Sequence, residues 1–362
     1  MKIGILTHYN VNNMGAQLQM YFMKAWLEEH GIEVCIWIYD KNFDLNKEEQ
    51  KKNSGSLRNI PYYFYNYLIK RGFGLTLFNY KKTRKIRKLQ IEEHLCFAPY
   101  DHNDCDAVII GSDEVFSIQV GCNRMMYGYG FNQKAIAYAP SFGMTDVDTL
   151  KENGFYELIS EGLKTMHRVS SRDIHTQKMI EALCGRETTL VCDPVLLFDK
   201  TVDVPVKQIP YKFMLIYAYD QNMTDEKEVQ SIKKYAKKHS LKTLSIGTYH
   251  KWCDGNIVCD PLEWYSYFSQ ASIVLTDTFH GAIAAIRHHC ELAVFIRKNI
   301  NANKIGHLMN SLQMSDRIIA SISAEEIERV FSNTTDYSSV EQSLEEIRRV
   351  SNEYLIEGIN SL

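Results

Sequence analysis

The chain has 362 residues, and at about 150 residues per domain this length predicts two domains and excludes a single small binding module. Hydrophobic residues make up 45% of it and charged residues 23%, with 7 Pro and 19 Gly, which excludes a disordered or fibrous protein. The 41 Lys and Arg residues against 44 Asp and Glu give a formal net charge of -3, which excludes a molecule-wide attraction for nucleic acid.

The cysteine residues and the apolar runs bear on the compartment. Nine Cys are present, an odd number without a C-x-x-C pair, so the sequence predicts reduced, mostly buried thiols and no disulfide framework. The first residues contain too short an apolar run for a signal peptide, and no stretch approaches the ~18 apolar residues of a membrane span. We therefore expect a cytoplasmic protein.

The first predicted elements form a parallel βαβ unit. Residues 2–7 and 32–39 are apolar runs typical of buried strands, and an amphipathic helix that ends near Gly31 lies between them. This succession is typical of an α/β domain. Further strands of this domain are predicted at residues 107–110, 135–139 and 167–169.

Residues 57–95 differ in composition from their surroundings, and we expect a helical insertion there. Within residues 61–88, eight aromatic residues precede six basic residues among the eight from Lys81 to Lys88. One interpretation is a helix that buries its aromatic residues against the first domain and exposes a charged face. The other is peripheral contact with an anionic membrane, since aromatic rings settle at the interface and basic side chains attract headgroups.

A second α/β set follows a linker. Pro residues without periodicity mark residues 193–211 as the linker, so we place the domains at residues 1–195 and 196–362. Apolar side chains at helical spacing over residues 339–359 predict a terminal helix. The other elements predicted in this half are strands at 213–217, 243–246, 273–276 and 292–295 and helices from residues 225, 262, 279 and 303.

Ligands of parallel α/β sheets bind beyond the carboxyl ends of strands, so we expect functional residues in the loops there. After the first strand, Asn13 and Gly15 precede a helix whose unpaired N–H groups can cradle an anion, although a lone glycine also fits a tight turn. After the third strand come Ser112 and Asp113, and Asp113 either faces the cleft or caps a helix. Ser141, in a similar loop, either donates a hydrogen bond to an anionic oxygen or serves the turn.

Arg172 is predicted on the first turn of a helix that starts near Ser171. A guanidinium beside a helix N-terminus is electrostatically unfavourable unless an anion lies between them. We therefore interpret Arg172 as an anion ligand. The alternative is an ion pair with Asp173 or with another carboxylate.

His280 lies in the strongest local pattern of the chain. Residues 272–286 predict a buried strand, a polar turn and a nearly all-apolar helix, and His280 stands at the mouth of that helix. Since the helix terminus disfavours an imidazolium unless a phosphate is bound, His280 is predicted as a proton donor or phosphate ligand. The alternative is a capping or core histidine. The His and Cys residues near 250–259 and 288–290 lack four donors at a zinc spacing, so we expect no metal.

These loops together resemble the polysaccharide pyruvyl transferase family. The matching segments occur in the family's order and extend over most of the chain to about Arg317. They are Asn13-Met14-Gly15-Ala16-Gln17-Leu18-Gln19, Ile110-Gly111-Ser112-Asp113, Tyr138-Ala139-Pro140-Ser141-Phe142-Gly143, Ser171-Arg172-Asp173, Cys192-Asp193-Pro194-Val195-Leu196-Leu197 and Thr276-Asp277-Thr278-Phe279-His280-Gly281.

The resemblance implies two Rossmann-like domains facing a cleft, as in GT-B glycosyltransferases. It also implies transfer of the enolpyruvyl unit of phosphoenolpyruvate onto a sugar as a ketal, without a metal or other cofactor. Arg172 and His280 would be donor-site residues, with Lys304 on a later helix as a companion. Some relatives carry Arg at the position of Thr278, so this chain lacks that second donor-site guanidinium. Many relatives carry Trp at the position of Phe116, which is a lesser departure.

We therefore expect His280 and Asp113 to act as acid and base, in either order. The expected partners are phosphoenolpyruvate and a glycan of a cell-surface polysaccharide, either polymeric or lipid-linked, and no nucleic acid. A GT-B nucleotide-sugar glycosyltransferase and a non-catalytic binding protein for anionic glycans are the alternatives, because a fold does not fix a function. The residues expected to bind the donor are Arg172, Asn13, Gly15, Ser112, Ser141, Thr278, Gly281 and Lys304.

Overall fold

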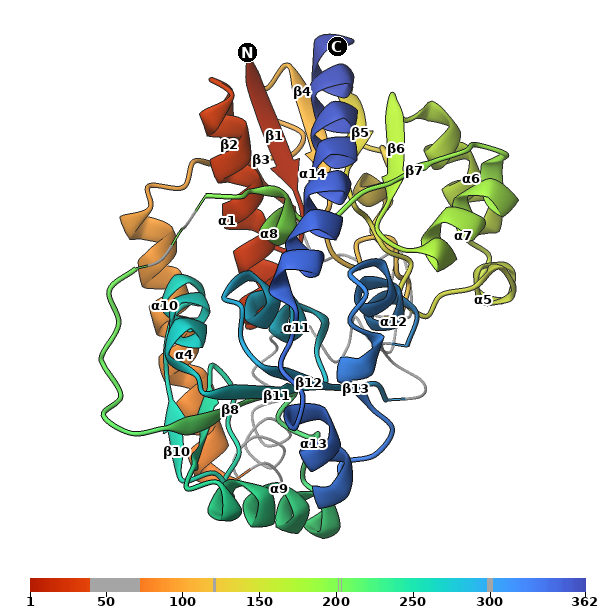
Figure 1. Cartoon of the computed structure of the whole chain (residues 1–362). Coiled ribbons are helices and arrows are strands. Elements are labelled where there is room, and N and C mark those ends of the chain that lie inside the picture. Colours follow the sequence, from red (N-terminus) through yellow and green to blue (C-terminus); the bar gives the residue numbers. More distant parts are fainter. Residues whose placement is uncertain (40–71, 120–121, 201, 203, 298–301) are drawn as a thin grey trace.

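The computed structural model describes residues 1–39, 72–119, 122–200, 202, 204–297 and 302–362. They form two α/β domains, one above the other in Figure 1, each built on its own sheet. The prediction of two parallel α/β domains is confirmed.

The first sheet has seven strands, all parallel, in the order β3-β2-β1-β4-β5-β6-β7. The chain therefore runs outward from β1 to one edge and then returns past it to the other. The strands are β1 (Lys2–Leu6), β2 (Glu33–Ile38), β3 (Phe97–Pro99), β4 (Ala107–Ile110), β5 (Lys134–Ala137), β6 (Arg168–Ser171) and β7 (Thr189–Leu190).

The second sheet repeats this topology with six parallel strands in the order β10-β9-β8-β11-β12-β13. In both sheets the reversal of direction falls beside the first strand, which is the Rossmann arrangement. The strands are β8 (Phe213–Tyr217), β9 (Lys242–Ile246), β10 (Gly255–Ile257), β11 (Ile273–Thr276), β12 (Leu292–Phe295) and β13 (Ile318–Ile319).

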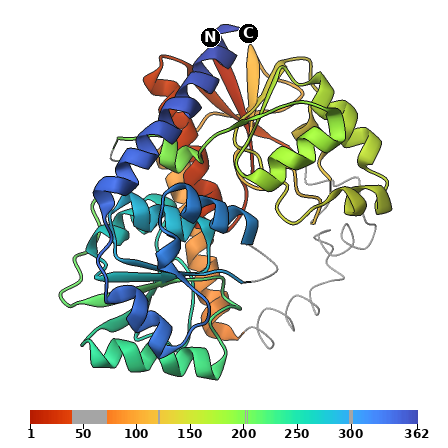
Figure 2. The same cartoon turned by 45° about the vertical axis from the view of Figure 1, so that its right-hand side comes forward.

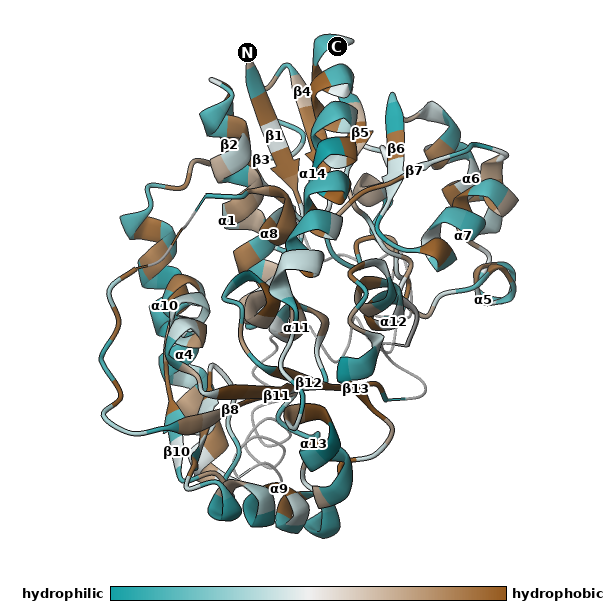
Figure 3. Cartoon of the chain, viewed as in Figure 1, coloured by the Kyte–Doolittle hydropathy of each residue, from teal (hydrophilic) through white to brown (hydrophobic). Residues whose placement is uncertain are grey.

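Helices connect the strands and cover the sheets. The outer helix α9 and the sheet interior differ sharply in hydropathy in Figure 3, as expected for sheets buried on both faces. The helices are α1 (Met14–Glu29), α4 (Phe73–Glu92), α5 (Val147–Glu152), α6 (Tyr156–Thr165), α7 (Ile174–Cys184), α8 (Pro194–Leu197), α9 (Glu226–Lys238), α10 (Pro261–Ser266), α11 (Phe279–Arg287), α12 (Ala302–Ser311), α13 (Ala324–Phe331) and α14 (Tyr337–Asn360).

Alternate residues of the first sheet enter two different cores. Ile5 and Ile109 pack in the cluster that includes side chains of α1 and α14, whereas Leu6 and Ile110 pack in the cluster with α6 and α7. All four side chains are fully buried. Neighbouring residues of a strand point to opposite faces, so a continuous apolar run is what a doubly covered strand requires.

Helix α14 follows the second sheet in sequence but runs along the first domain (Figure 2). Trp26 Nε1 donates a hydrogen bond to Asn352 Oδ1 at 2.7 Å, and Tyr354 OH donates to the Ala137 carbonyl at 3.0 Å. The terminal helix therefore joins the two domains.

Helix α4 is the described part of the predicted insertion, whose residues 57–71 lie outside the described residues. Its buried face contacts the second domain. Lys82 Nζ donates to the Gly247 carbonyl at 3.0 Å, and Lys85 Nζ pairs with Glu263 Oε2 at 2.5 Å. Among the described residues, no helix is long and apolar enough to cross a membrane.

The expected start of one helix is wrong. Helix α7 begins at Ile174, and its N-cap is Asp173, whose side chain accepts from Thr176 N at 2.8 Å. Arg172 therefore precedes the helix and does not lie on its first turn. Short strands such as β7 and β13, two residues each, were not predicted because they are too short to show a period.

Candidate active site

The two reversal points of strand order face one another and build one polar pocket. The loops after β1 and β4 contribute from the first domain, and those after β8 and β11 contribute from the second. Strands on either side of a reversal leave the sheet toward opposite faces, which opens a crevice at their carboxyl ends. The pocket has a volume of about 170 Å³, and its lining includes Asn13, Asp113, Glu114, Tyr219, His280 and Lys304.

Asp193 is the centre of a buried group of charges beside this pocket. Its Oδ2 accepts a hydrogen bond from Arg172 Nη1 at 3.1 Å and lies 3.4 Å from His280 Nε2. Its Oδ1 accepts from Val195 N at 3.1 Å, because Asp193 caps helix α8. One carboxylate therefore fixes an arginine of the first domain and a histidine of the second.

Both carboxylates of this group favour their charged forms. Burial disfavours ionisation of Asp113, but His280 and Arg172 outweigh burial and hold the pKa of Asp113 below its ordinary value. Burial likewise opposes ionisation of Asp193, and the same two side chains lower its pKa. Both groups are therefore ionised at neutral pH.

Arg172 forms ion pairs with Asp193 and Asp113. Its Nη2 lies 3.6 Å from Asp113 Oδ1, and its Cζ lies 4.5 Å from the centre of the Phe279 ring. Its Nε makes no hydrogen bond although the side chain is 2% exposed. Of the two interpretations of Arg172, the ion pair is present, with Asp193 and Asp113 in place of Asp173.

Lys304, on α12, is paired as well. Its Nζ donates to Glu114 Oε1, next to Asp113 in the chain. The two cations that the sequence assigned to the donor thus already face carboxylates. An anionic ligand has to compete with Glu114 for Lys304.

Gly15 is required for the close approach of the two domains at His280. A Cβ atom at Gly15 would lie 2.2 Å from His280 Cγ and Nδ1, well inside van der Waals contact. Gly281 is similarly tight, since a Cβ there would lie 2.4 Å from Thr276 Oγ1. At both positions glycine is needed because a side chain would collide with its neighbour, and not because the backbone turns there.

Asn13 and Thr278 are helix N-caps at the pocket. Asn13 Oδ1 accepts from Gly15 N at 2.9 Å and from Ala16 N at 3.2 Å, and Thr278 Oγ1 accepts from Gly281 N at 3.0 Å. These N–H groups, which the sequence suggested for an anion, are occupied by side chains.

Ser112 and Ser141 lie behind the pocket. Ser112 Oγ donates to the Ala139 carbonyl at 2.8 Å, and Ser141 Oγ donates to Asp173 Oδ2 at 2.8 Å. Both residues are at most 1% exposed. They hold the loops around Arg172 and do not reach the pocket.

Asp193 and Glu114 belong to the site but were not predicted there. Asp193 lies within a segment that matches the family, and the Asp-Pro pair is typical of a helix start. This pattern explains Asp193 as a helix cap and gives no sign of its contacts with Arg172 and His280. Glu114 lines the pocket and pairs with Lys304, and the sequence gives no signal of that pairing. Within the part of the chain that the structure describes, no group of three or more His, Cys, Asp or Glu is arranged to hold a metal ion.

Comparisons with known proteins agree with this architecture. A family model described as polysaccharide pyruvyl transferase matches residues 13–299. No curated protein matches the chain.

Solved structures show the fold. A putative UDP-N-acetylglucosamine 2-epimerase from Listeria monocytogenes has a TM-score of 0.52 at 10% identity, over 99% of this chain and 96% of its own. MnaA of S. aureus, solved with UDP, has a TM-score of 0.50 at 10% identity, over 98% and 92%. The spinosyn rhamnosyltransferase SpnG has a TM-score of 0.45 at 11% identity, over 100% of both chains. At such identities a likeness describes the fold alone.

Proposed function

We propose, because this chain belongs to the polysaccharide pyruvyl transferase family, that it transfers the pyruvyl unit of phosphoenolpyruvate to a sugar of a cell-surface polysaccharide or of its lipid-linked precursor. One observation carries the proposal. His280 from the second domain and Asp113 from the first line the same polar pocket, where a donor and an acceptor would meet. Pairs of titratable groups of this kind are what acid–base chemistry needs.

The donor is an anion with a carboxylate and a phosphate. Lys304 is its first partner in the pocket, and donor binding displaces Glu114 from it. Arg172 supplies further donors through Nε and Nη2, neither of which makes a hydrogen bond. A planar guanidinium suits both carboxylate and phosphate.

Two side chains, His280 and Asp113, suffice for the proton transfers of this reaction. Protonated His280 gives its proton to the methylene carbon of phosphoenolpyruvate, and the middle carbon becomes electrophilic. A sugar hydroxyl attacks that carbon while Asp113 accepts the hydroxyl proton. The bond from this carbon to the phosphate oxygen then breaks, and the phosphate leaves with the electron pair and takes the proton from Asp113. A neighbouring hydroxyl closes the ketal and returns a proton to His280.

The surroundings suit these roles. A base has to be ionised before it accepts a proton, and His280 and Arg172 keep Asp113 ionised by lowering its pKa against the effect of burial. The same two side chains weaken its basicity, so they have to release it as the donor binds. An acid has to be oriented, and Asp193 Oδ2 lies 3.4 Å from His280 Nε2. Asp193 is thus a positioning residue.

The substitution His280→Asn tests the proposal. We expect turnover of phosphoenolpyruvate with a glycan acceptor to fall about a hundredfold or more, the usual effect of a lost acid or base, while the melting temperature changes little. Mass spectrometry of the acceptor would follow the pyruvyl increment. The matched control is His289→Asn, because His289 is exposed and pairs with Glu341 away from the pocket.

Near-normal turnover in folded His280→Asn would reject the role of His280. The nucleotide-sugar alternative is tested by thermal shift, since a ligand that binds only the folded state raises the melting temperature. Stabilisation by nucleotide sugars and not by phosphoenolpyruvate would favour a glycosyltransferase. Stabilisation by the glycan alone, without phosphate release, would favour a binding protein.

A further inference from the structure

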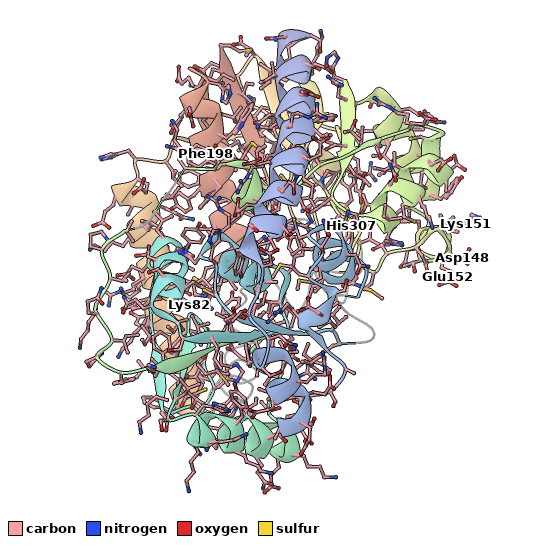
Figure 4. All side chains as sticks on the ribbon, viewed as in Figure 1. Lys82, Asp148, Lys151, Glu152, Phe198 and His307 are labelled. Carbon is pink, nitrogen blue, oxygen red and sulfur yellow. The ribbon has the colours of Figure 1, made fainter. Side chains whose placement is uncertain are left out.

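A second cavity lies between the domains, with a volume of about 400 Å³. It shares Phe279 and Lys304 with the polar pocket, but its other walls come from the segment after β7 and from helices α8, α12 and α14. His307, one of its lining residues, is labelled in Figure 4 on α12, at the level between the two domains. The proposed transfer gives this cavity no role.

Aliphatic side chains of α8, α12 and α14 form one part of the cavity wall. Polar side chains, among them Ser311, Ser343 and the exposed Glu346, form another part. Glu346 is itself paired with Arg349, at 2.7 Å. The aliphatic lining includes Leu196, Leu308, Leu312, Ile347 and Val350.

Arg172 brings unused hydrogen-bond donors to this cavity, while its charge is balanced by Asp193 and Asp113. It lines the cavity and is 4% exposed, yet neither Nε nor Nη2 makes a hydrogen bond. Buried donors are normally satisfied, and an unsatisfied one is costly. Asp193 also lines the cavity, but its two oxygens already accept from Arg172 Nη1 and Val195 N.

We propose that this cavity is a binding site for an aliphatic anion, a medium-length alkyl chain ending in a phosphate or carboxylate. The alkyl chain of the ligand lies between α12 and α14 among the leucine, isoleucine and valine side chains. The anionic end accepts hydrogen bonds from Arg172 Nε and Nη2, with the Lys304 ammonium nearby. The proposed transfer assigns the same two Arg172 nitrogens to phosphoenolpyruvate, so the two anions exclude one another there. The test measures binding of the alkyl anion alone and requires no transfer.

Decyl phosphate is the probe, used below its micelle concentration, with isothermal titration calorimetry as the measurement. We expect one site per chain. Removing either half of the probe should weaken binding, so inorganic phosphate and decanol should each bind at least tenfold more weakly than decyl phosphate. Decanol binding as tightly as decyl phosphate would overturn the assignment of the anionic end to Arg172.

A variant that fills the cavity tests where the alkyl chain of the ligand lies. Val350→Trp places an indole among the aliphatic walls and should weaken decyl phosphate binding at least tenfold. Ile356→Trp is the matched control, because Ile356 is on the same helix but 40% exposed and outside the cavity. Ile347→Phe serves the same purpose if Val350→Trp does not fold. Equal binding by the filled variant and the control would reject the site.

Discussion

At the scale of single residues, the buried ion pair of Arg172 and Asp193 ties binding to stability. Arg172 is 4% exposed and Asp193 is 1% exposed, so neither charge is solvated when the other is removed. Breaking such a pair on one side costs about 3–5 kcal/mol. Loss of activity in Arg172→Ala therefore includes unfolding, and donor affinity has to be measured on the folded fraction.

Gly15→Ala is the sharpest residue-scale prediction. The new Cβ would meet the His280 ring at 2.2 Å, and neither the α1 backbone nor the packed α11 terminus can move freely. We expect the imidazole to shift from Asp193 and turnover to fall about as much as in His280→Asn. The melting temperature should fall as well, since overpacking costs about 1–3 kcal/mol.

Gly306→Ala is the control for this change. Gly306 lies in α12, and a Cβ there meets nothing within 4 Å. Alanine should leave turnover unchanged and should stabilise the helix by up to about 1 kcal/mol. Full activity in Gly15→Ala would show that the contact with His280 does not position the imidazole.

At the scale of elements, helix α4 has two faces with different surroundings. Lys82 and Lys85 contact the second domain, so these two residues of the predicted basic run are not free for another partner. Residues 61–71, with most of the aromatic residues, lie outside the described residues. The outward side chains that remain are Phe73, Tyr80, Lys81, Arg84, Arg87 and Lys88.

The proposal of peripheral membrane contact rests on this outward face of α4. We expect the protein to sediment with anionic liposomes at low salt and to be released at high salt, because exposed charges are screened. Each basic residue near an anionic surface contributes about 1 kcal/mol. Neutralising Lys81, Arg84 and Arg87 to Gln should therefore weaken binding by about two orders of magnitude.

The control removes the same charge elsewhere. Lys233, Lys234 and Lys237 are exposed on α9, at the far end of the second domain in Figure 1. Their change to Gln should leave most of the binding in place. An equal loss of liposome binding in both variants would show that net charge alone attracts the protein. If the wild type does not bind even at low salt, the role of α4 is to join the two domains.

At the scale of the whole molecule, Lys82 is a buried cation at the contact between domains. It is 4% exposed, and its Nζ donates to the Gly247 carbonyl at 3.0 Å; the residue is labelled in Figure 4. Burial lowers the pKa of Lys82, against the weaker effect of Asp220. The folded state therefore binds this proton less tightly than the unfolded chain does.

The sign of the pH dependence follows from that difference. Because the unfolded chain binds more protons at Lys82, this group's contribution to stability rises with pH up to the ordinary lysine pKa of about 10.4. We expect the free energy of unfolding of wild type relative to Lys82→Met to increase between pH 7 and pH 10. An increase of about 1.4 kcal/mol corresponds to each unit by which the pKa of Lys82 is lowered.

Urea unfolding across this pH range measures the effect. Lys81→Met is the control, since Lys81 is the neighbouring lysine but is exposed, and its difference from wild type should stay flat. A flat difference for Lys82→Met would mean that the ammonium is solvated in the folded protein.

The sequence by itself determined the two sheets and the loops that matter. The apolar runs at residues 107–110 and 273–276 are buried strands. A strand that is covered on both faces needs an apolar residue at every position, so such a run can be recognised in the sequence. The carboxyl ends of parallel strands meet at one edge of the sheet, so the sequence alone selects the loops that hold Asp113 and His280. Their residue types were sufficient to indicate a polar site.

Only the tertiary structure decided what those residues contact. The pairing of Arg172 with Asp193, of Lys304 with Glu114, and of His280 with Gly15 joins positions 21, 190 and 265 residues apart. Such pairs follow from how loops and domains pack in three dimensions, and local periodicity reports only which face of an element is buried. Electrostatic partners across an interface leave no period in the sequence, so the charges of this site could be located only in three dimensions.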